Sequence, residues 1–169
     1  MLNNLIVVIS GGAGRIGSAF SRVVVENGGK VIIGDMNSEL GNRLVADLGD
    51  NVSLFFEGNL TEPNTVDLMI RKGLEKFEKI DAAVHCAYPV SEQWGTRFED
   101  LKPASIENDL FNQLGGAILF SQRMIRHFRQ QEHGNLLHIS SIQGLKTPKF
   151  EHYDGTDMIS PIEYSAIKS

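Results

Sequence analysis

The chain has 169 residues, of which 41% are hydrophobic and 22% are charged. This composition is ordinary for a soluble globular protein and excludes disordered and collagen-like chains. The net charge is −5 and the basic residues are scattered along the chain, so neither a nucleic-acid-binding nor a membrane-surface protein is expected. The single cysteine, Cys86, excludes an internal disulfide and a cysteine-based zinc cluster.

The N-terminal segment lacks the features of a targeting signal. Residues 1–4 carry no basic side chain, and the apolar run that follows ends at Gly11, too early for a signal peptide or a membrane span. The expected location is therefore the cytoplasm, where a lone cysteine stays reduced.

Short apolar runs alternate with segments of helical periodicity along the chain. In chain order the sequence predicts a strand at 5–9, a helix at 15–27, a strand at 30–34, a helix at 38–48 capped by Ser38, a strand at 52–56, a helix at 62–77, a strand at 80–86, a Pro/Gly-punctuated stretch at 89–103, a long helical region from 105 to about 131, and a strand at 135–139. No repeat or interdomain linker is visible.

Strands that alternate with helices of this length predict right-handed βαβ units. The expected fold class is α/β: a doubly wound parallel sheet, or Rossmann fold, with helices on both faces. We expect residues 1–169 to form a single dinucleotide-binding domain of this kind that lacks its C-terminal part. In such sheets ligands bind beyond the carboxyl ends of the strands, where the chemistry should therefore be sought.

A glycine-rich loop joins the first predicted strand to the first predicted helix. Its Gly12-x-Gly14-x-x-Gly17 spacing allows backbone to approach a pyrophosphate, and the helix that follows offers free N–H groups to negative charge. The alternative is a glycine-rich turn without a ligand. No Gly-Lys-Ser/Thr ending follows, which disfavours a P-loop nucleotidase.

Asp35 follows the apolar residues of the second predicted strand. A carboxylate there can accept hydrogen bonds from ribose hydroxyls and would repel a 2′-phosphate, so NAD is favoured over NADP. Two alternatives stay open. Asp35 can belong to a turn only, and the cations Arg15 and Arg43 can accommodate an additional phosphate.

Two further motifs follow the fifth predicted strand. They are Ser140-Ser141-Ile142-Gln143-Gly144 and Tyr164-x-x-x-Lys168. Together with the glycine loop, Asp35 and an Asn59-Leu60 pair, they resemble the short-chain dehydrogenase/reductase family over the whole chain. Tyr-x-x-x-Lys alone is an unspecific motif, and its order after the other elements makes the combination specific.

The resemblance implies catalytic roles. Tyr164 would exchange a proton with the substrate oxygen while a nicotinamide exchanges a hydride with the substrate carbon, and Lys168, one helical turn away, would stabilise the phenolate and hold the nicotinamide ribose. Ser141 would hydrogen-bond the substrate oxygen. Asn112 is the best candidate for the family's helix asparagine, and Asn108 is the next. The alternatives are turn-forming serines and a solvated tyrosine and lysine.

The expected binding residues come from the strand ends and the two motifs. The expected cofactor-binding residues are Gly11, Gly14, Arg15, Ile16, Gly17, Asp35, Asn59, Leu60, Ala87, Tyr164 and Lys168. The expected catalytic residues are Ser141, Tyr164, Lys168 and Asn112. No grouping has metal-ligand spacing, so no metal site is expected. His85 and His138, inside or beside predicted strands, are expected to be structural.

Two departures from the family pattern bear on the substrate. Tyr88 stands where the family commonly has glycine and would reshape the pocket near the nicotinamide. An insertion at 146–158 overhangs the predicted site. With Pro161-Ile162-Glu163, this insertion is similar to family members associated with flagellin modification and surface-sugar biosynthesis, which implies a sugar-derived substrate.

The expected function is NAD-dependent interconversion of a secondary alcohol and a ketone on a sugar-like small molecule. One alternative is an extended-type relative that epimerises or dehydrates nucleotide sugars, supported by the Gly11-x-x-Gly14-x-x-Gly17 spacing. Another is a dinucleotide-binding module without turnover, supported by the length. Because the chain stops at Ser169, we expect this chain alone to bind NAD weakly and turn over little. The full-length protein is expected to be a homo-oligomer.

Overall fold

The structure is a computed structural model that describes residues 2–156 and 159–169. These residues form two compact units. The first unit runs up to Ala87 and includes Gly116–Ile139, and the second comprises Tyr88–Gly115 and Ser140–Ser169. Asp157 and Met158, the end of the expected insertion, lie outside the described residues.

The first unit contains a five-stranded parallel sheet in the order β3-β2-β1-β4-β5. Its strands are β1 (Ile6–Ser10), β2 (Lys30–Asp35), β3 (Ser53–Glu57), β4 (Ala82–His85) and β5 (Asn135–His138). The chain moves outward from β1 to β3 and then returns to β4 on the other side of β1. This arrangement confirms the doubly wound α/β fold and puts its ligand-binding crevice at the carboxyl ends of β1 and β4.

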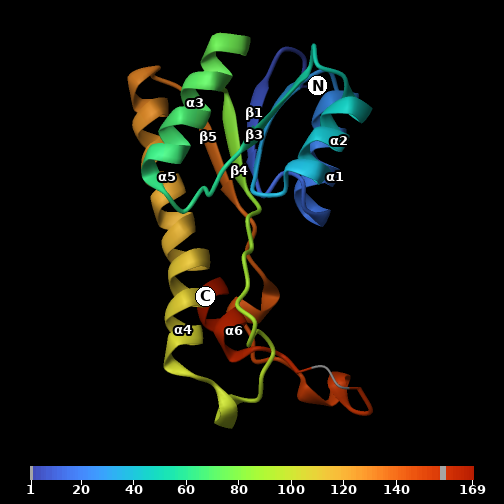
Figure 1. The fold of residues 1–169 in the computed structure, drawn as a ribbon, viewed down its shortest axis with the longest axis vertical. Helices are drawn as coiled ribbons and strands as arrows, with labels where there is room; N and C mark the ends of the chain where they lie inside the picture. Colours follow the sequence, from blue (N-terminus) through green and yellow to red (C-terminus); the bar gives the residue numbers. More distant parts are fainter. Residues whose placement is uncertain (1, 157–158) are drawn as a thin grey trace. The chain divides into compact units, whose positions relative to one another are not determined.

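Helices cover both faces of this sheet. They are α1 (Arg15–Glu26), α2 (Ser38–Leu48), α3 (Pro63–Phe77) and α5 (Gly116–Gln130). Figure 1 shows α1 and α2 on one face and α3 and α5 on the other. The predicted alternation of strands and helices is therefore confirmed.

Two hydrophobic cores lie on opposite faces of the sheet. Val8 belongs to the core that contains Met69 of α3, whereas Ile9 belongs to the core that contains Leu44 of α2. Successive strand residues point to opposite faces, and both Val8 and Ile9 are 0% exposed. Burial on both sides explains why β1 and β2 are continuous apolar runs in the sequence.

The N-cap of α2 is Asn37, not Ser38. The Asn37 Oδ1 accepts a hydrogen bond from the Leu40 amide at 2.9 Å. Asn37 has the extended backbone of a cap, with φ −89° and ψ 95°, while Ser38 is already helical. Asparagine and serine are equally good caps, so the prediction of Ser38 was wrong by one residue because side-chain preference alone cannot choose between them.

The second unit consists of short helices and loops. They include η1 (Phe98–Asp100), α4 (Pro103–Asp109), η2 (Leu110–Gly115), η3 (Ile142–Gly144), η4 (Phe150–Tyr153) and α6 (Ile162–Lys168). The η2 segment is π-helical, so it interrupts the long helical region that the sequence predicted. The α6 helix packs against η3 and η2. A β-carbon at Gly144 would collide with the Lys168 carbonyl group, so glycine is required where η3 meets the end of α6.

Candidate active site

The glycine loop lies at the carboxyl end of β1, as predicted. Gly11 has a φ of 65°, in the left-handed region, and a β-carbon there would lie 2.6 Å from the Ala87 Cα. A β-carbon at Gly17 would collide with the Gly11 carbonyl oxygen. Both positions therefore require glycine. Gly14 is exposed, so the loop presents bare backbone to an approaching ligand.

The start of α1 suits a negatively charged group. Its N-cap is Gly14, and within the described residues no side chain caps the helix and no acidic residue stands in its first turn. Arg15 and Ile16 follow and are exposed. Uncapped amides at the start of a 12-residue helix attract anions. The loop and the helix start together fit the pyrophosphate of a dinucleotide.

The Asp35 carboxylate makes two hydrogen bonds to backbone amides. One oxygen accepts from Ala13 at 3.0 Å and the other accepts from Asn37 at 3.0 Å. The first bond ties the glycine loop to β2, and the second shapes the turn into α2. A carboxylate has about four acceptor positions, so capacity remains for ribose hydroxyls. The turn role of Asp35 is thus present, and it is compatible with cofactor binding.

A buried polar contact joins the carboxyl ends of β1 and β4. The Ser10 Oγ and the His85 Nδ1 are 2.6 Å apart, and both residues are buried. The Ala87 amide donates to the same Oγ at 3.4 Å. His138 contacts the Ser121 Oγ through its Nε2 at 2.9 Å. Both histidines make structural hydrogen bonds, as expected for their places in the sheet.

Asn59 and Leu60 support the start of α3. The Asn59 Oδ1 accepts from the Thr61 amide at 3.1 Å and from the Thr61 hydroxyl at 2.9 Å, and its Nδ2 donates to Glu62 at 3.2 Å. Leu60 is 7% exposed and belongs to the core of the α3 face. Its side chain is therefore occupied in packing, and only its main chain is available to a cofactor.

Tyr164 and Lys168 lie one turn apart on α6. The Lys168 Nζ lies 6.0 Å from the centroid of the Tyr164 ring and 5.3 Å from that of the Tyr88 ring. The rings of Tyr88 and Tyr164 meet edge to face, with centroids 5.6 Å apart and an interplanar angle of 85°. The Trp94 ring lies 5.2 Å from Tyr88 and 6.3 Å from Tyr164. We call Tyr88, Trp94 and Tyr164 the aromatic cluster.

Ser140 and Ser141 both make local hydrogen bonds. The Ser141 Oγ accepts from the Gln143 amide at 3.2 Å and caps η3. The Ser140 Oγ donates to the Lys168 carbonyl oxygen at 3.1 Å. This bond and the close approach at Gly144 bring the serine motif against the helix that carries the tyrosine and lysine. The two motifs predicted to act together are therefore adjacent in the second unit.

In the π-helical segment η2, the buried amide side chain is that of Gln113 and not that of the predicted Asn112. Asn112 is partly buried, and its Nδ2 donates to the Asn108 Oδ1 at 2.5 Å, so the two candidate asparagines pair with each other. Gln113 is 3% exposed, and its side-chain amide has no hydrogen-bond partner among the described residues. Gln113 was not predicted from the sequence, because a single π-turn leaves little trace in apolar periodicity.

Two buried carboxylates accompany the aromatic cluster. Asp109 is 1% exposed and accepts from the Ser91 amide and the Ser91 hydroxyl, both at 2.7 Å. Glu163 is 4% exposed, and its oxygens have no hydrogen-bond partner in the part of the chain that the structure describes. Tyr88 is 36% exposed. Its partial burial, followed by the nearby Tyr164, Asp109 and Glu163, raises the pKa of Tyr88 above its ordinary value. Tyr88 is therefore a neutral phenol at physiological pH.

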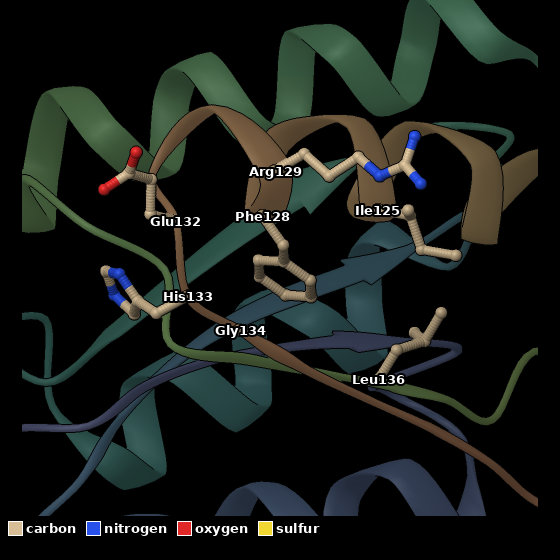
Figure 2. A pocket seen from close by; sticks show the side chains of 7 residues that line it. All are labelled: Ile125, Phe128, Arg129, Glu132, His133, Gly134 and Leu136. Atoms are coloured by element: carbon tan, nitrogen blue, oxygen red, sulfur yellow. The ribbon is translucent and has the colours of Figure 1, made fainter.

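The first unit contains a cavity of about 560 Å³. Figure 2 shows its lining at the end of α5 and the start of β5: Ile125, Phe128, Arg129, Glu132, His133, Gly134 and Leu136. This is the amino end of the parallel sheet, opposite the glycine loop. The cavity is therefore not the expected cofactor site.

Among residues 2–156 and 159–169, no group of three or more His, Cys, Asp or Glu side chains is placed to hold a metal ion. No helix in the described part of the chain has both the length and the apolar character needed to cross a membrane.

Comparisons with known proteins identify the family of this chain. A family model described as short chain dehydrogenase matches residues 5–156. Post-translational flagellin modification protein A of Campylobacter coli is 35% identical over 173 residues, which cover 100% of this chain and 68% of that protein. The 7alpha-hydroxysteroid dehydrogenase of Bacteroides fragilis is 27% identical over 146 residues, which cover 84% of this chain and 56% of that protein.

A solved structure shows the same fold. A short chain dehydrogenase from Bacillus anthracis has a TM-score of 0.86 and 18% sequence identity, covering 99% of this chain and 64% of that chain. This chain thus spans 68%, 56% and 64% of the lengths of these three proteins. The chain belongs to the short-chain dehydrogenase/reductase family, whose members are oxidoreductases that bind NAD or NADP.

Proposed function

We propose that the protein is an NAD-dependent oxidoreductase that interconverts a secondary alcohol and a ketone on a sugar-derived substrate. The observation that carries this proposal is the placement of Tyr164 and Lys168 one turn apart on α6, with the ammonium over the aromatic cluster. A tyrosine with a lysine one helical turn away is a suitable pair for proton transfer to or from a substrate oxygen.

The residues of the first unit fit a dinucleotide. The glycines of the loop have no side chains that would obstruct a pyrophosphate, and α1 offers its uncapped amides to the charge. The acceptor capacity of Asp35 suits ribose hydroxyls, and its negative charge disfavours a 2′-phosphate, which supports NAD over NADP. The other proposed contacts are Gly11, Gly14, Arg15, Ile16, Gly17, Asn59, Ala87, Tyr164, Lys168 and the main chain of Leu60.

The catalytic proposal assigns one task to each side chain. When bound, the nicotinamide gives or takes the hydride. Tyr164 exchanges the proton with the substrate oxygen at its phenol oxygen, and Lys168 stabilises the phenolate. The Ser141 Oγ accepts a bond from Gln143 and keeps its own hydrogen, which it donates to the substrate oxygen. Asn112 remains our proposed helix asparagine, in the π-helical segment that packs against α6.

The substrate class rests on the relatives and on the insertion. The similarity to the Campylobacter coli protein named for flagellin modification supports a sugar-derived small molecule. We also propose a cytoplasmic homo-oligomer. The support for association is that Ile118 and Ile125, one heptad apart on α5, are 60% and 45% exposed.

Substitution of Tyr164 tests the proposal. The enzyme is expressed from its complete reading frame and assayed by nicotinamide absorbance with sugar phosphates and nucleotide sugars. Tyr164→Phe should lower turnover by about 10²- to 10⁴-fold, as expected for loss of a general acid or base. NADH affinity should not change. Tyr153→Phe, a matched control outside the aromatic cluster, should keep full turnover. Unchanged turnover in Tyr164→Phe would refute the assignment.

A further inference from the structure

Tyr88 lies at the centre of the aromatic cluster. Its ring meets Trp94 at 5.2 Å with an interplanar angle of 90° and meets Tyr164 at 5.6 Å with an angle of 85°. Its ring also lies under the Lys168 ammonium, at 5.3 Å. Edge-to-face pairs and cations over a ring are both favoured by the ring quadrupole. One residue of the loop after β4 therefore contacts both members of the tyrosine and lysine pair.

A contact with an aromatic ring can restrict the Lys168 side chain. Lys168 is the last residue of α6, a helix of 7 residues, and a lysine side chain is long and has many rotamers. Its Nζ is nearer to the Tyr88 ring, at 5.3 Å, than to the Tyr164 ring, at 6.0 Å. A ring at Tyr88 therefore restricts where the ammonium can lie relative to the Tyr164 phenol.

The surroundings of Tyr88 keep it out of proton transfer. Partial burial, and after it the nearby Tyr164, Asp109 and Glu163, raise the pKa of Tyr88, so this phenol keeps its proton. Lys168 supplies the positive charge that faces the ring of Tyr88.

We propose that Tyr88 is a positioning residue for the Tyr164–Lys168 pair, an inference that rests on the proposed function of that pair. The face of the Tyr88 ring holds the ammonium, and its edge contact fixes the Tyr164 ring. Trp94 packs against both rings and completes the cluster. Tyr88, which stands where the family commonly has glycine, thus positions the Tyr164–Lys168 pair.

Two substitutions distinguish the contribution of the Tyr88 aromatic ring from the contributions of its volume and its hydroxyl group. Tyr88→Phe keeps the ring, and Tyr88→Leu keeps apolar volume without a π face. In the enzyme expressed from its complete reading frame, Tyr88→Phe should keep kcat and the pH profile of alcohol oxidation. Tyr88→Leu should lower kcat by about two- to five-fold. It should also move the acidic limb of the profile to higher pH by about half a unit, with KM for NAD unchanged.

Trp94 provides a readout that does not depend on turnover. It is the only tryptophan of the chain, so selectively excited emission reports on the aromatic cluster. Tyr88→Leu should change the intensity of this emission and its quenching by acrylamide, whereas Tyr88→Phe should resemble the wild type. Phe98→Leu changes an aromatic side chain that is 72% exposed at the start of η1, and it should leave both emission and kinetics unchanged.

The outcomes distinguish this inference from the proposed function. If Tyr164→Phe is inactive but Tyr88→Leu has the wild-type pH profile and emission, the positioning role is wrong and the proposed function stands. If Tyr88→Phe is inactive and Tyr164→Phe is active, Tyr88 transfers the proton. The positioning role of Tyr88 and the proposed catalytic role of Tyr164 are then both wrong. If Tyr88→Leu does not fold, Tyr88→Met replaces it, because methionine also keeps apolar volume without an aromatic ring.

Discussion

The Asp35 carboxylate at the end of β2 holds the Ala13 amide of the glycine loop at 3.0 Å. Its second oxygen holds the Asn37 amide at 3.0 Å, so one side chain sets both the loop and the start of α2. Hydrogen bonds to an ionised acceptor are about twice as strong as neutral ones. The shape of the proposed pyrophosphate site therefore depends on a residue outside the loop.

Asp35→Ala should weaken NADH binding by about ten-fold, because the loop loses a charge-assisted bond and the Ala13 amide is left unpaired. It should also reduce discrimination against NADPH, since the repulsive carboxylate is gone. Fluorescence titrations with the two cofactors measure both effects. Asp50→Ala removes an exposed carboxylate after α2 and should change neither. Discrimination as strong as in the wild type would show that another residue excludes the 2′-phosphate.

Gly144→Ala should displace the end of α6, because the added β-carbon would collide with the Lys168 carbonyl group. Overpacking of this kind costs about 1–3 kcal/mol, so calorimetry should show a lower Tm. Turnover should also fall, because the tyrosine and lysine move with the helix. Leu145→Ala is the matched control, since the Leu145 side chain is 86% exposed. Wild-type kinetics in Gly144→Ala would mean that η3 does not position α6.

The raised pKa of Tyr88 predicts a loss of stability in alkali. A phenol whose pKa is higher in the folded state stabilises that state fully below its unfolded pKa, about 10. The stabilisation is lost as the pH rises through the folded pKa. The unfolding free energy of the wild type minus that of Tyr88→Phe should therefore be constant up to about pH 10 and fall above it. Urea denaturation across this range measures the difference, and a constant difference in alkali would contradict the expectation.

Glu163→Gln should make Tyr88 easier to ionise, because the buried Glu163 carboxylate is one of the groups that raise the Tyr88 pKa. Ultraviolet titration of tyrosinate measures this, and the step that is absent in Tyr88→Phe identifies Tyr88. That step should move to lower pH in Glu163→Gln. Glu92→Gln removes an exposed carboxylate from the same loop and should leave the step in place. An unmoved step in Glu163→Gln would show that Glu163 is too well screened to act on the phenol.

The strands β1 and β2 could be predicted because burial on both faces makes them continuous apolar runs. The bounds of β1 and β2 lie within one residue of those expected. The cap of α2 could not be predicted, since Asn37 and Ser38 are chemically equivalent candidates and only the bond to Leu40 decides between them. The π-helical segment was not predicted because one additional residue in a turn leaves the helical pattern nearly intact.

The motif residues proposed for the site could be chosen as candidates from the sequence, because they belong to short motifs that follow one another in a fixed order. The contacts of Tyr88 could not. The loop that brings Tyr88, Trp94 and Tyr164 together has no periodicity, so nothing in the sequence relates these three positions. What the sequence did show was an unusual residue after Ala87, at a position where the family commonly has glycine.

The sheet of the first unit divides the buried side chains into two cores that share no packing partners. Val8 and Ile9 are neighbours in sequence but belong to cores on opposite faces, so their packing partners are not shared. Val8 and Met69 are distant in sequence and lie in one core. Substitutions in contact or with shared partners are coupled, and those without shared partners are close to additive. Thermodynamic coupling in this unit therefore follows the face of the sheet and not distance along the chain.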